Sequence, residues 1–287
     1  MNKKIHLVVT YFNRKKLFLH TLKTLQGYNK EQYNLNVIAV DDGSSPDHRL
    51  EDIVNNYDFN IKIIYIDPNI KTWVNPCVTY NIGFFNIEPE SEDDIVIIQN
   101  PETCHMGDIL GHAFNNLTHD DYFVYHCLAF DNNQTNTLIA HESKPEDITS
   151  ITESGIYAGD QVGAQWYVHK DHNPRYFHFC SSLTYKNLKL LNGFDMRYAS
   201  GDAFDDNELA YRIKNSKLNR KFIPDPFVVH LWHKAYEPKD WTNWYRNRDL
   251  FKKVTKTEKN VTVNKDKFGI SSDFSKTEII KYLNLHE

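Results

Sequence analysis

The chain has 287 residues, with 33 Lys and Arg against 38 Asp and Glu, which gives a formal net charge of −5. A chain of this length can form one large α/β domain or two small ones, with a substantial core. The mild acidity and the lack of a Lys/Arg run give no electrostatic case for a nucleic-acid partner. Aromatic residues make up 14% of the chain, and Tyr and Trp often line sites for sugars, although they are as often core.

The cysteines and the N-terminus favour a cytoplasmic protein. The cysteines lie far apart without a CxxC pair, which indicates buried, reduced thiols rather than a zinc or redox site. The apolar run that follows Met1 ends at Thr10, too soon for a signal peptide or a membrane span. We therefore expect no transmembrane segment, while peripheral association with a membrane stays open. The four cysteines are Cys77, Cys104, Cys127 and Cys180.

Buried strands and amphipathic helices alternate through the first half of the chain. The apolar run at 5–10 is typical of a strand buried on both faces, and helical spacing follows at 15–25. Strands alternating with helices predict an α/β fold with a mostly parallel, Rossmann-like sheet flanked by helices, whose ligands bind outside the carboxyl ends of the strands. Further strands are expected at 36–40, 61–66, 95–98 and 122–125, and further helices near 50–54, from Pro76 to 85 and at 109–117.

The second half is expected to be less regular. Residues 131–175 are polar and lack a period, so we interpret them as a flap that covers a ligand, with a disordered insertion as the alternative. Within this flap, Trp166 would offer a stacking surface to an acceptor sugar. Pro224 and Pro226 place a later strand at an edge or bend. The remaining strands are expected at 177–183 and 220–230, and the remaining helices at 185–191, 241–254 and 277–285.

An acidic cluster formed by Asp202, Asp205, Asp206 and Glu208 opens a helical pattern. Carboxylates in the first turn of a helix complement its dipole and can face a cleft. Because these charges repel one another, they need solvent, a metal, a substrate or a cation such as Arg212, four residues after Glu208. We interpret the cluster as a candidate site, and a solvated helix start is the alternative.

Polar residues also follow three of the expected strands. Tyr11–Arg14 come after the first strand, Asp41–Ser45 after the second and Gln99–Glu102 after the fourth. Ligands of parallel sheets bind at the carboxyl ends, so these segments are expected to share a site. The glycine motifs GxGxxG and GxxxxGKS/T are absent, which argues against a dinucleotide-binding or P-loop protein.

Taken in order, several motifs resemble those of the family 2 glycosyltransferases of the GT-A fold. Val8–Arg14, Ala39–Ser45 and Asn81-Ile82-Gly83 resemble their nucleotide-binding half. Asn192-Gly193-Phe194-Asp195, followed by Asp205–Leu209 and Arg212, is similar to their acceptor half, in a galactosyltransferase-like form. The resemblance spans about residues 5–235.

This resemblance implies one GT-A domain at 1–255. Its nucleotide-sugar half would be 1–126, its acceptor half 127–235 with the flap at 131–175, and 256–287 would be a C-terminal extension with helical additions. The implied activity is that of a hexosyltransferase, which transfers a sugar from a nucleotide-sugar donor, expected to be a UDP-sugar. The acceptor would be a hydroxyl of a glycan, glycolipid or glycoprotein, as in polysaccharide biosynthesis.

The resemblance also assigns the donor site. Thr10, Phe12 and Asp42 would hold the nucleoside, with Asp41 and Asn13 supporting the loop. Asn75 or Tyr80 stands near the place of a family arginine that has no obvious counterpart, and Gln99 or Asn100 could hydrogen-bond the ribose. The implied set of nucleotide-sugar-binding residues is Thr10, Tyr11, Phe12, Asn13, Arg14, Asp41, Asp42, Asn75, Gln99 and Asn100.

The chain departs from the family at its metal motif. Where the family carries Asp-x-Asp, this sequence has Gln99-Asn100-Pro101-Glu102. Glu102 can still be a hard oxygen ligand, and His230 and His233 could supply nitrogen ligands. Such a mixed site would favour Mn²⁺ over Mg²⁺. The alternative is that His230 is a core histidine and that no metal is needed.

The acidic helix would carry the chemistry. The acceptor hydroxyl needs a general base within hydrogen-bond reach. Asp206 aligns with the base of the inverting enzymes and Asp205 would bind acceptor hydroxyls, although the two acids could exchange these roles. Two other classes compete. A nucleotidyltransferase would want a Gly-rich, basic N-terminal loop, whereas a weak or inactive nucleotide-sugar or glycan binder would have lost Asp-x-Asp.

Overall fold

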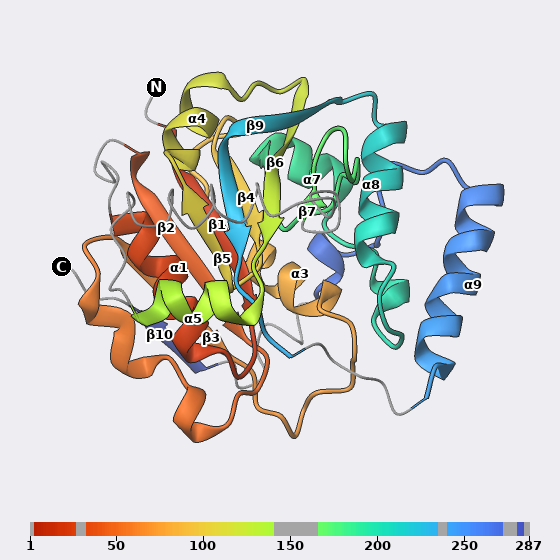
Figure 1. Cartoon of the computed structure of the whole chain (residues 1–287). Helices are drawn as coiled ribbons and strands as arrows, with labels where there is room; N and C mark the ends of the chain where they lie inside the picture. The colour runs from red at the N-terminus through yellow and green to blue at the C-terminus, as the bar shows by residue number, and fades with distance from the viewer. Residues whose placement is uncertain (1–2, 27–32, 141–165, 235–239, 272–279, 284–287) are drawn as a thin grey trace.

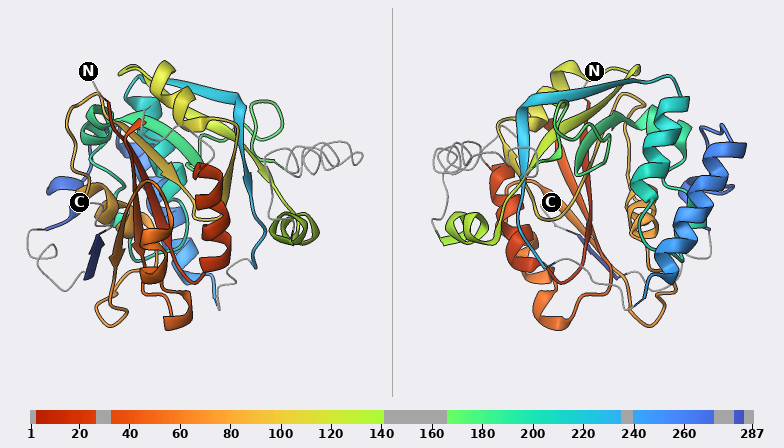
Figure 2. Two further views of the ribbon diagram at one scale, coloured as in Figure 1. Left: turned by 90° about the vertical axis from the view of Figure 1, so that its left-hand side faces the viewer. Right: turned by 45° about the vertical axis from the view of Figure 1, so that its right-hand side comes forward.

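The structure is a computed structural model that describes residues 3–26, 33–140, 166–234, 240–271 and 280–283. One curved sheet runs through these parts and helices cover both faces (Figure 1). Helix α1 (Lys15–Gln26) lies on one side, and α8 (Asp205–Asn215) and α9 (Thr242–Thr257) lie on the other (Figure 2). The strands are β1 (Ile5–Tyr11), β2 (Leu35–Asp41), β3 (Asn60–Tyr65), β4 (Ile95–Gln99), β5 (Thr103–Met106), β6 (Asp121–Ala129), β7 (Trp166–Val168), β8 (Cys180–Thr184), β9 (Asn219–His230) and β10 (Ile280–Leu283). The other α-helices are α3 (Cys77–Phe85), α4 (Ile109–Asn116), α5 (Asn132–Ala140) and α7 (Tyr185–Leu191).

The expected α/β fold and its parallel N-terminal half are confirmed. Strand order is β10-β3-β2-β1-β4-β8-β6-β9-β5, with β7 on β6. Strands β1 to β4 pair in parallel, with Tyr11 opposite Asp41 and Val9 opposite Gln99. Beyond β4 the sheet is mixed, because β8 is antiparallel to both β4 and β6. Strands β1, β2 and β4 are apolar on both faces because helices cover both sides.

Helix α3 joins the two halves of the sequence resemblance. At Gly83 a Cβ atom would meet Val8 Cγ1 at 2.5 Å, so a glycine is needed for this helix to lie on β1. The Asn81 amide donates to the Phe194 carbonyl at 2.8 Å and accepts from the Phe194 N–H at 2.8 Å. Gly193 approaches Asn81 with a φ of +75°. The residues that carry the resemblance therefore fasten the segment at Gly193 and Phe194 to α3.

Several expectations about local structure were wrong. The helix expected near 50–54 is a pair of 3₁₀ turns, Pro46–His48 and Glu51–Asn56. Strand β5 was not predicted from the sequence. A terminal helix was expected at 277–285, but the described residues of that range, 280–283, form strand β10. Short strands are defined by pairing partners far away in sequence, which periodicity does not report.

The segment expected as a flap contains regular structure. Helix α5 and strand β7 occupy its two ends, and β7 pairs with β6. Residues 141–165 lie outside the described part, so closure over a ligand stays a prediction. As expected, Pro224 and Pro226 mark a bend in β9. The pairing of β9 with β6 shifts register there, and β5 pairs with the part of β9 that follows the prolines, Phe227–His230.

The C-terminal segment packs on the same core. Phe268 is fully buried, with its ring centroid 5.9 Å from that of Phe84 on α3. The proposed domain boundary at 255 stays a prediction. None of the helices in the described part is both long and apolar enough to cross a bilayer.

Candidate active site

The ends of β1 and β2 form one loop cluster. Asn13, at φ +51°, donates its N–H to Ser44 Oγ at 2.9 Å, and its side-chain oxygen accepts from the Ser45 N–H at 2.9 Å. Asn13 thus ties the first loop to the second. Phe12 remains 49% exposed, with Lys71 Nζ 5.3 Å from its ring centroid. An exposed ring held at a sheet end can stack on a flat ligand such as a nucleobase.

The two aspartates after β2 have different tasks. Asp41 is buried and accepts the Ser44 N–H at 2.8 Å; burial raises its pKa to about 6. Asp42 accepts from Lys71 Nζ at 2.6 Å and from Trp73 Nε1 at 3.0 Å. Burial raises the pKa of Asp42, against the lowering effect of Lys71. Asp41 therefore shapes the turn, while Asp42 is the acid held beside Phe12.

Three other residues that the resemblance assigns to the nucleotide-sugar site form hydrogen bonds within the protein. Tyr11 is buried and donates its hydroxyl to the His48 carbonyl. The buried Gln99 amide donates to the Thr103 carbonyl at 2.7 Å and lies 2.7 Å from His105 Nε2. Asn100 Oδ1 accepts from Tyr80 at 3.2 Å.

Tyr80 also connects β1 to this group. Its hydroxyl donates to the Gln99 carbonyl at 3.1 Å and interacts with the side chain of Thr10. Burial raises the pKa of Tyr80, so it stays a neutral donor. Thr10 and Asn100 thus meet at one hydroxyl between β1 and β4.

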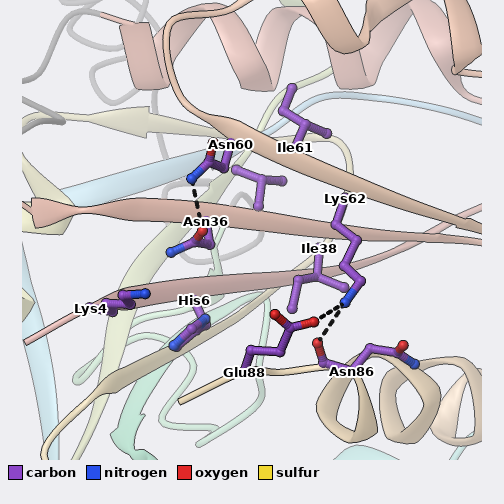
Figure 3. A pocket seen from close by; sticks show the side chains of 10 residues that line it. Lys4, His6, Asn36, Ile38, Asn60, Ile61, Lys62, Asn86 and Glu88 are labelled. Atoms are coloured by element: carbon purple, nitrogen blue, oxygen red, sulfur yellow. Dashed lines mark hydrogen bonds and ion pairs between the residues drawn. The ribbon is translucent and has the colours of Figure 1, made fainter. Parts of the chain in front are cut away.

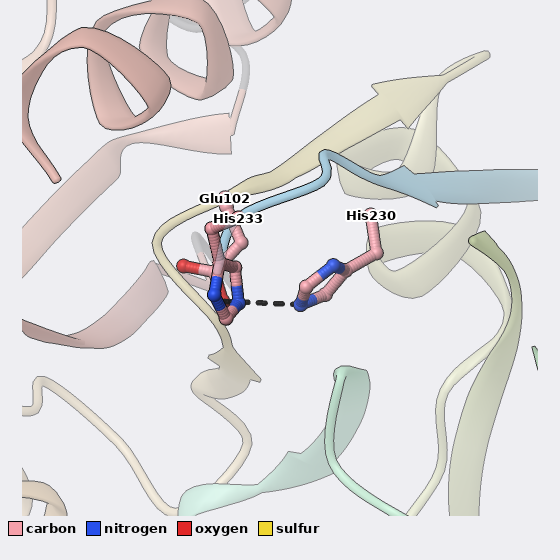
Figure 4. Close-up of side chains that lie close together, drawn as sticks. All are labelled: Glu102, His230 and His233. Carbon is pink, nitrogen blue, oxygen red and sulfur yellow. Dashed lines mark ion pairs between the residues drawn. The ribbon is translucent and has the colours of Figure 1, made fainter. Parts of the chain in front are cut away.

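Glu102 gathers three basic side chains, two of which, His230 and His233, are drawn with it in Figure 4. Its Oε1 lies 3.0 Å from His230 Nε2, 3.1 Å from His233 Nε2 and 2.8 Å from Arg14 Nη1. The pairing of β5 with β9 sets this contact, because Thr103 lies opposite His230. Burial alone would raise the pKa of Glu102, but the histidines and Arg14 outweigh it and hold the pKa well below its usual range.

This group fits a divalent cation. One donor atom from each of Glu102, His230 and His233 lies within 4.8 Å of the others, and Glu102 Oε2 is buried without a hydrogen-bond partner among the described residues. One carboxylate with two imidazoles suits Mn²⁺ better than Mg²⁺, which prefers all-oxygen sites. The Arg14 guanidinium places a further positive charge beside the carboxylate of Glu102, in addition to that of a bound cation. The three residues that the sequence suggested as metal ligands do come together.

The acidic helix begins in a strained turn. Ala203 and Phe204 have φ values of +58° and +66°, which non-glycine residues rarely adopt. Two buried amides bind the Ala203 carbonyl, Asn75 at 3.1 Å and Asn247 of α9 at 2.9 Å. Asn75 also lies 3.3 Å from Asp205 Oδ1. Asn75 therefore positions the start of the acidic helix, and its predicted contact with a nucleotide sugar stays a prediction.

The two acids at the start of α8 differ in exposure. Asp205 is buried, and burial and the charge of Asp206 raise its pKa. The Asp206 side chain is 29% exposed, with Oδ1 2.6 Å from His178 Nδ1 and 3.1 Å from the His178 N–H. Although burial opposes protonation of His178, the charges of Asp206 and Asp205 raise its pKa. Asp206 is the more accessible acid, oriented by a buried histidine.

The segment His178-Phe179 connects the two charged groups. His178 contacts Asp206, while the ring of Phe179 lies 5.5 Å from that of His230, beside Glu102. The Phe179 carbonyl also accepts the Asn100 N–H at 3.2 Å. The acidic start of α8 and the Glu102 group therefore flank one short segment, just before β8, at the carboxyl end of the parallel strands.

Two sequence-based interpretations change in detail. Trp166 packs against His169 and Phe227, while its neighbour Tyr167 lies 4.9 Å from the His230 ring. The contact of Trp166 with a sugar stays a prediction. Glu208 does pair with Arg212, at 2.6 Å, and both side chains are only 1% exposed, so this is a pair in the core and not on the solvated helix surface.

The residues of this site that the sequence analysis did not assign are Lys71, Trp73, Tyr167 and His178. Lys71, Trp73 and His178 lie in irregular segments and Tyr167 lies in the short strand β7, and no sequence spacing connects any of them to its partner. A cavity of about 250 Å³ lies at the opposite ends of the strands, lined by Lys4, His6, Asn36, Lys62 and Glu88 among others (Figure 3). It shares no residue with the site.

Comparison with solved structures supports the fold. S. aureus TarS 1-349 in complex with UDP-GlcNAc matches with a TM-score of 0.58 at 14% identity, over 86% of this chain and 65% of that one. The mannosyltransferase PcManGT from Pyrobaculum calidifontis, in complex with GDP-Man and Mn²⁺, matches with a TM-score of 0.50 at 15% identity, over 91% of this chain and 66% of that one. The chain shares their fold and spans just under two thirds of their length. No family model and no curated protein matches it.

Proposed function

We propose that the chain is an inverting glycosyltransferase of the family 2, GT-A type. It would transfer a sugar from a UDP-sugar to a hydroxyl of a glycan, glycolipid or glycoprotein. The observation that carries the proposal is the placement of Asp206 and the Glu102 group on either side of His178-Phe179, at the sheet end that also holds Phe12 and Asp42. The four cysteines are free and buried, which supports the cytoplasmic location that we propose.

The donor would lie across the loops after β1 and β2. The exposed ring of Phe12 stacks on the base, and Asp42, held by Lys71 and Trp73, accepts a base N–H or a ribose hydroxyl. Thr10, Asn100 and their partner Tyr80 line the path towards β4. The sugar is thereby directed towards the start of α8.

The leaving diphosphate requires neutralisation of its charge. Glu102, His230 and His233 would hold Mn²⁺, or Mg²⁺, which when bound would supply positive charge to the diphosphate. Arg14, whose side chain is 33% exposed, stands at the same carboxylate and can bind a phosphate oxygen through its guanidinium. Two independent sources of positive charge therefore compensate for the missing Asp-x-Asp motif.

Asp206 would take the proton of the acceptor hydroxyl. Its oxygen is the more exposed of the α8 pair, and His178 orients it through a contact at 2.6 Å. Attack by the acceptor oxygen on the anomeric carbon from the face opposite the diphosphate inverts the configuration in a single displacement. Asp205, with its raised pKa, would bind acceptor hydroxyls, and an exchange of roles between the two acids remains the alternative.

The test of donor binding uses purified protein, UDP and GDP, with Mn²⁺ or EDTA. A ligand that binds the native state raises the melting temperature, and at about one hundred times its Kd the gain is about 2.7 kcal/mol. We expect UDP with Mn²⁺ to raise the melting temperature most, and His230→Ala to remove the effect of Mn²⁺ but not all of the effect of UDP. Equal shifts in Mn²⁺ and in EDTA would exclude an essential cation at Glu102.

A catalytically inactive nucleotide-sugar binder is the second candidate. It is favoured by one observation: Glu102 is already compensated by Arg14 and two histidines, so the group is stable without a substrate. The two candidates differ in turnover. Release of UDP from a UDP-sugar by the wild type, with loss of that release in Asp206→Asn, supports the enzyme, whereas binding without release supports the binder.

A further inference from the structure

We propose that the N-terminal end of α9, with the turn before α8, forms a second sugar-binding subsite, which holds the part of a glycan acceptor that extends away from the reacting hydroxyl. The subsite consists of Phe204, Trp241, Trp244 and Tyr245, with Asp202 at its edge. The proposal rests on the proposed function for the identity of the reacting site, and it adds the class of acceptor: an extended carbohydrate with sugar units beyond the one that reacts.

The aromatic side chains form one continuous group. The Trp244 ring lies 5.9 Å from the ring of Trp241 and 5.4 Å from that of Tyr245, both edge-on. The helical spacing of three and four residues places them on neighbouring positions of one face. Trp241 is 56% exposed and Tyr245 47% exposed, so the outer members present ring surface to solvent. Apolar C–H faces of sugar rings stack on such surfaces.

The group is continuous with the acidic start of α8. Phe204, the residue immediately before Asp205, lies 5.3 Å from the Trp244 ring. The Asp202 N–H donates to the Asn243 carbonyl at 3.1 Å, and Asn247 binds the Ala203 carbonyl. Helix α9 is therefore fastened to the turn that carries the catalytic acids. A glycan whose hydroxyl reaches Asp206 would have its next units directed over α9.

Polar groups suited to hydroxyls surround the rings. Asp202 Oδ2 is buried without a hydrogen-bond partner among the described residues, and Asp240 is exposed one residue before Trp241. The Arg248 guanidinium lies 4.6 Å from the Tyr245 ring centroid and pairs with Asp249 at 2.8 Å. Carboxylates that accept hydrogen bonds from hydroxyls, placed around stacking rings, are groups suited to bind a carbohydrate.

The mixed charge around the rings distinguishes this group from a membrane-binding helix. Helices that lie in a bilayer interface combine exposed aromatic residues with a polar face rich in Lys and Arg. Around Trp241 and Tyr245, two arginines, Arg246 and Arg248, stand with three acidic residues, Asp202, Asp240 and Asp249, and Arg248 pairs with Asp249. Among these residues positive charge does not exceed negative charge, so they do not form the basic face that an anionic bilayer attracts. The lysines of α9 lie further along the helix, at 252, 253 and 256.

The experiment compares the wild type, Trp241→Ala and Leu190→Ala on an array of immobilised glycans. Leu190 is a matched control because it is an exposed apolar residue, at 46%, on α7 rather than on the subsite. We expect the wild type and Leu190→Ala to retain the same oligosaccharides, and Trp241→Ala to lose about tenfold or more of the signal. All three proteins should keep the same melting temperature.

Three results would overturn the subsite. These are no glycan retained by the wild type, equal retention by Trp241→Ala, or retention of the wild type by phosphatidylglycerol vesicles that Trp241→Ala abolishes. Release of UDP from UDP-sugars in solution, measured in parallel, separates this proposal from the proposed function. Glycan binding that depends on Trp241 without any release of UDP would reject the enzyme and keep the subsite.

Discussion

At the scale of single residues, buried carboxylates are compensated in two ways. Glu102 meets Arg14 from the loop after β1 and two histidines from the end of β9, whereas Glu208 meets one arginine a turn later on the same helix. Arg212 also donates to the carbonyls of Leu191 and Gly193 at 2.8 Å each. Glu208 and Arg212 therefore act in folding, and Glu102 remains available for chemistry.

Loss of Arg212 should be costly. Arg212→Met leaves Glu208 buried without its partner, and breaking a buried pair costs about 3–5 kcal/mol. We expect the free energy of unfolding in urea to fall by that amount. The double variant Glu208→Leu with Arg212→Met, which leaves no unpaired charge, should recover part of the loss. A single variant as stable as the wild type would show that Glu208 is not held ionised.

The contact between His178 and Asp206 predicts a pH dependence. The pKa of His178 is raised above its ordinary 6.5, so the folded state binds its proton more tightly than the unfolded state. This stabilisation is fully present below 6.5 and is lost as the pH rises through the higher folded value. The difference in unfolding free energy between the wild type and His178→Asn should therefore shrink as the pH rises above 6.5, in urea titrations at several pH values. A constant difference would contradict a protonated His178.

The residues of the site could be predicted where strand ends place them, and not otherwise. Phe12 and Asp42 directly follow buried strands and Glu102 comes three residues after one, so the carboxyl-end rule finds them. Lys71 and His178 lie in irregular segments, and only the tertiary fold brings them to Asp42 and Asp206. The pair His230 and His233 was found because the two histidines stand three residues apart at the end of an expected strand.

At the scale of elements, the start of α8 is the point of strain. Two consecutive residues with positive φ, Ala203 and Phe204, precede the acids, and amides from two other elements bind the carbonyl between them. Left-handed residues cost of order 1 kcal/mol each, and they persist where the surroundings hold them. The strain places Asp205 and Asp206 at the first helical turn, where the helix dipole stabilises their negative charge.

A matched pair of glycine variants tests this strain. Ala203 has a φ of +58°, where glycine is not penalised, whereas Ala199 has a φ of −53°. Ala199→Gly should lower stability by about 0.5–1 kcal/mol through unfolded-state entropy. Ala203→Gly should be neutral or stabilising within about 1 kcal/mol, because the relieved strain offsets that entropy. Thermal unfolding measures both, and an equal loss in the two variants would show that the turn is unstrained.

The strands and helices that could be predicted from the sequence are those whose burial leaves a clear apolar pattern in the chain. Continuous apolar runs identified β1, β2 and β4, and the helical period identified α1, α4 and α7. No comparable run marks the short strands β5 and β10 or helix α5. The two strands form by pairing with partners distant in sequence, and α5 has a polar sequence.

At the scale of the whole molecule, the sheet changes from parallel to mixed between β4 and β8. Strand β8 runs antiparallel to β4, so the chain just before it, at His178 and Phe179, lies at the carboxyl ends of β1, β2 and β4. That reversal brings His178 and Phe179 to the same sheet end as the loops after β1 and β2. The sequence indicated the two halves by resemblance, but the reversal follows from long-range pairing that no local pattern reports.

The central claim is that Asp206 serves as the base in sugar transfer from a UDP-sugar. The most direct measurement is the rate of UDP release from a panel of UDP-sugars by the wild type and by Asp206→Asn, with the Kd of UDP measured for both. The exposed Asp171→Asn serves as the control. We predict that Asp206→Asn lowers the rate about 10²-fold or more with an unchanged Kd for UDP, as expected for loss of a general base. Full turnover by Asp206→Asn, or no release of UDP by the wild type from any donor, would contradict the account.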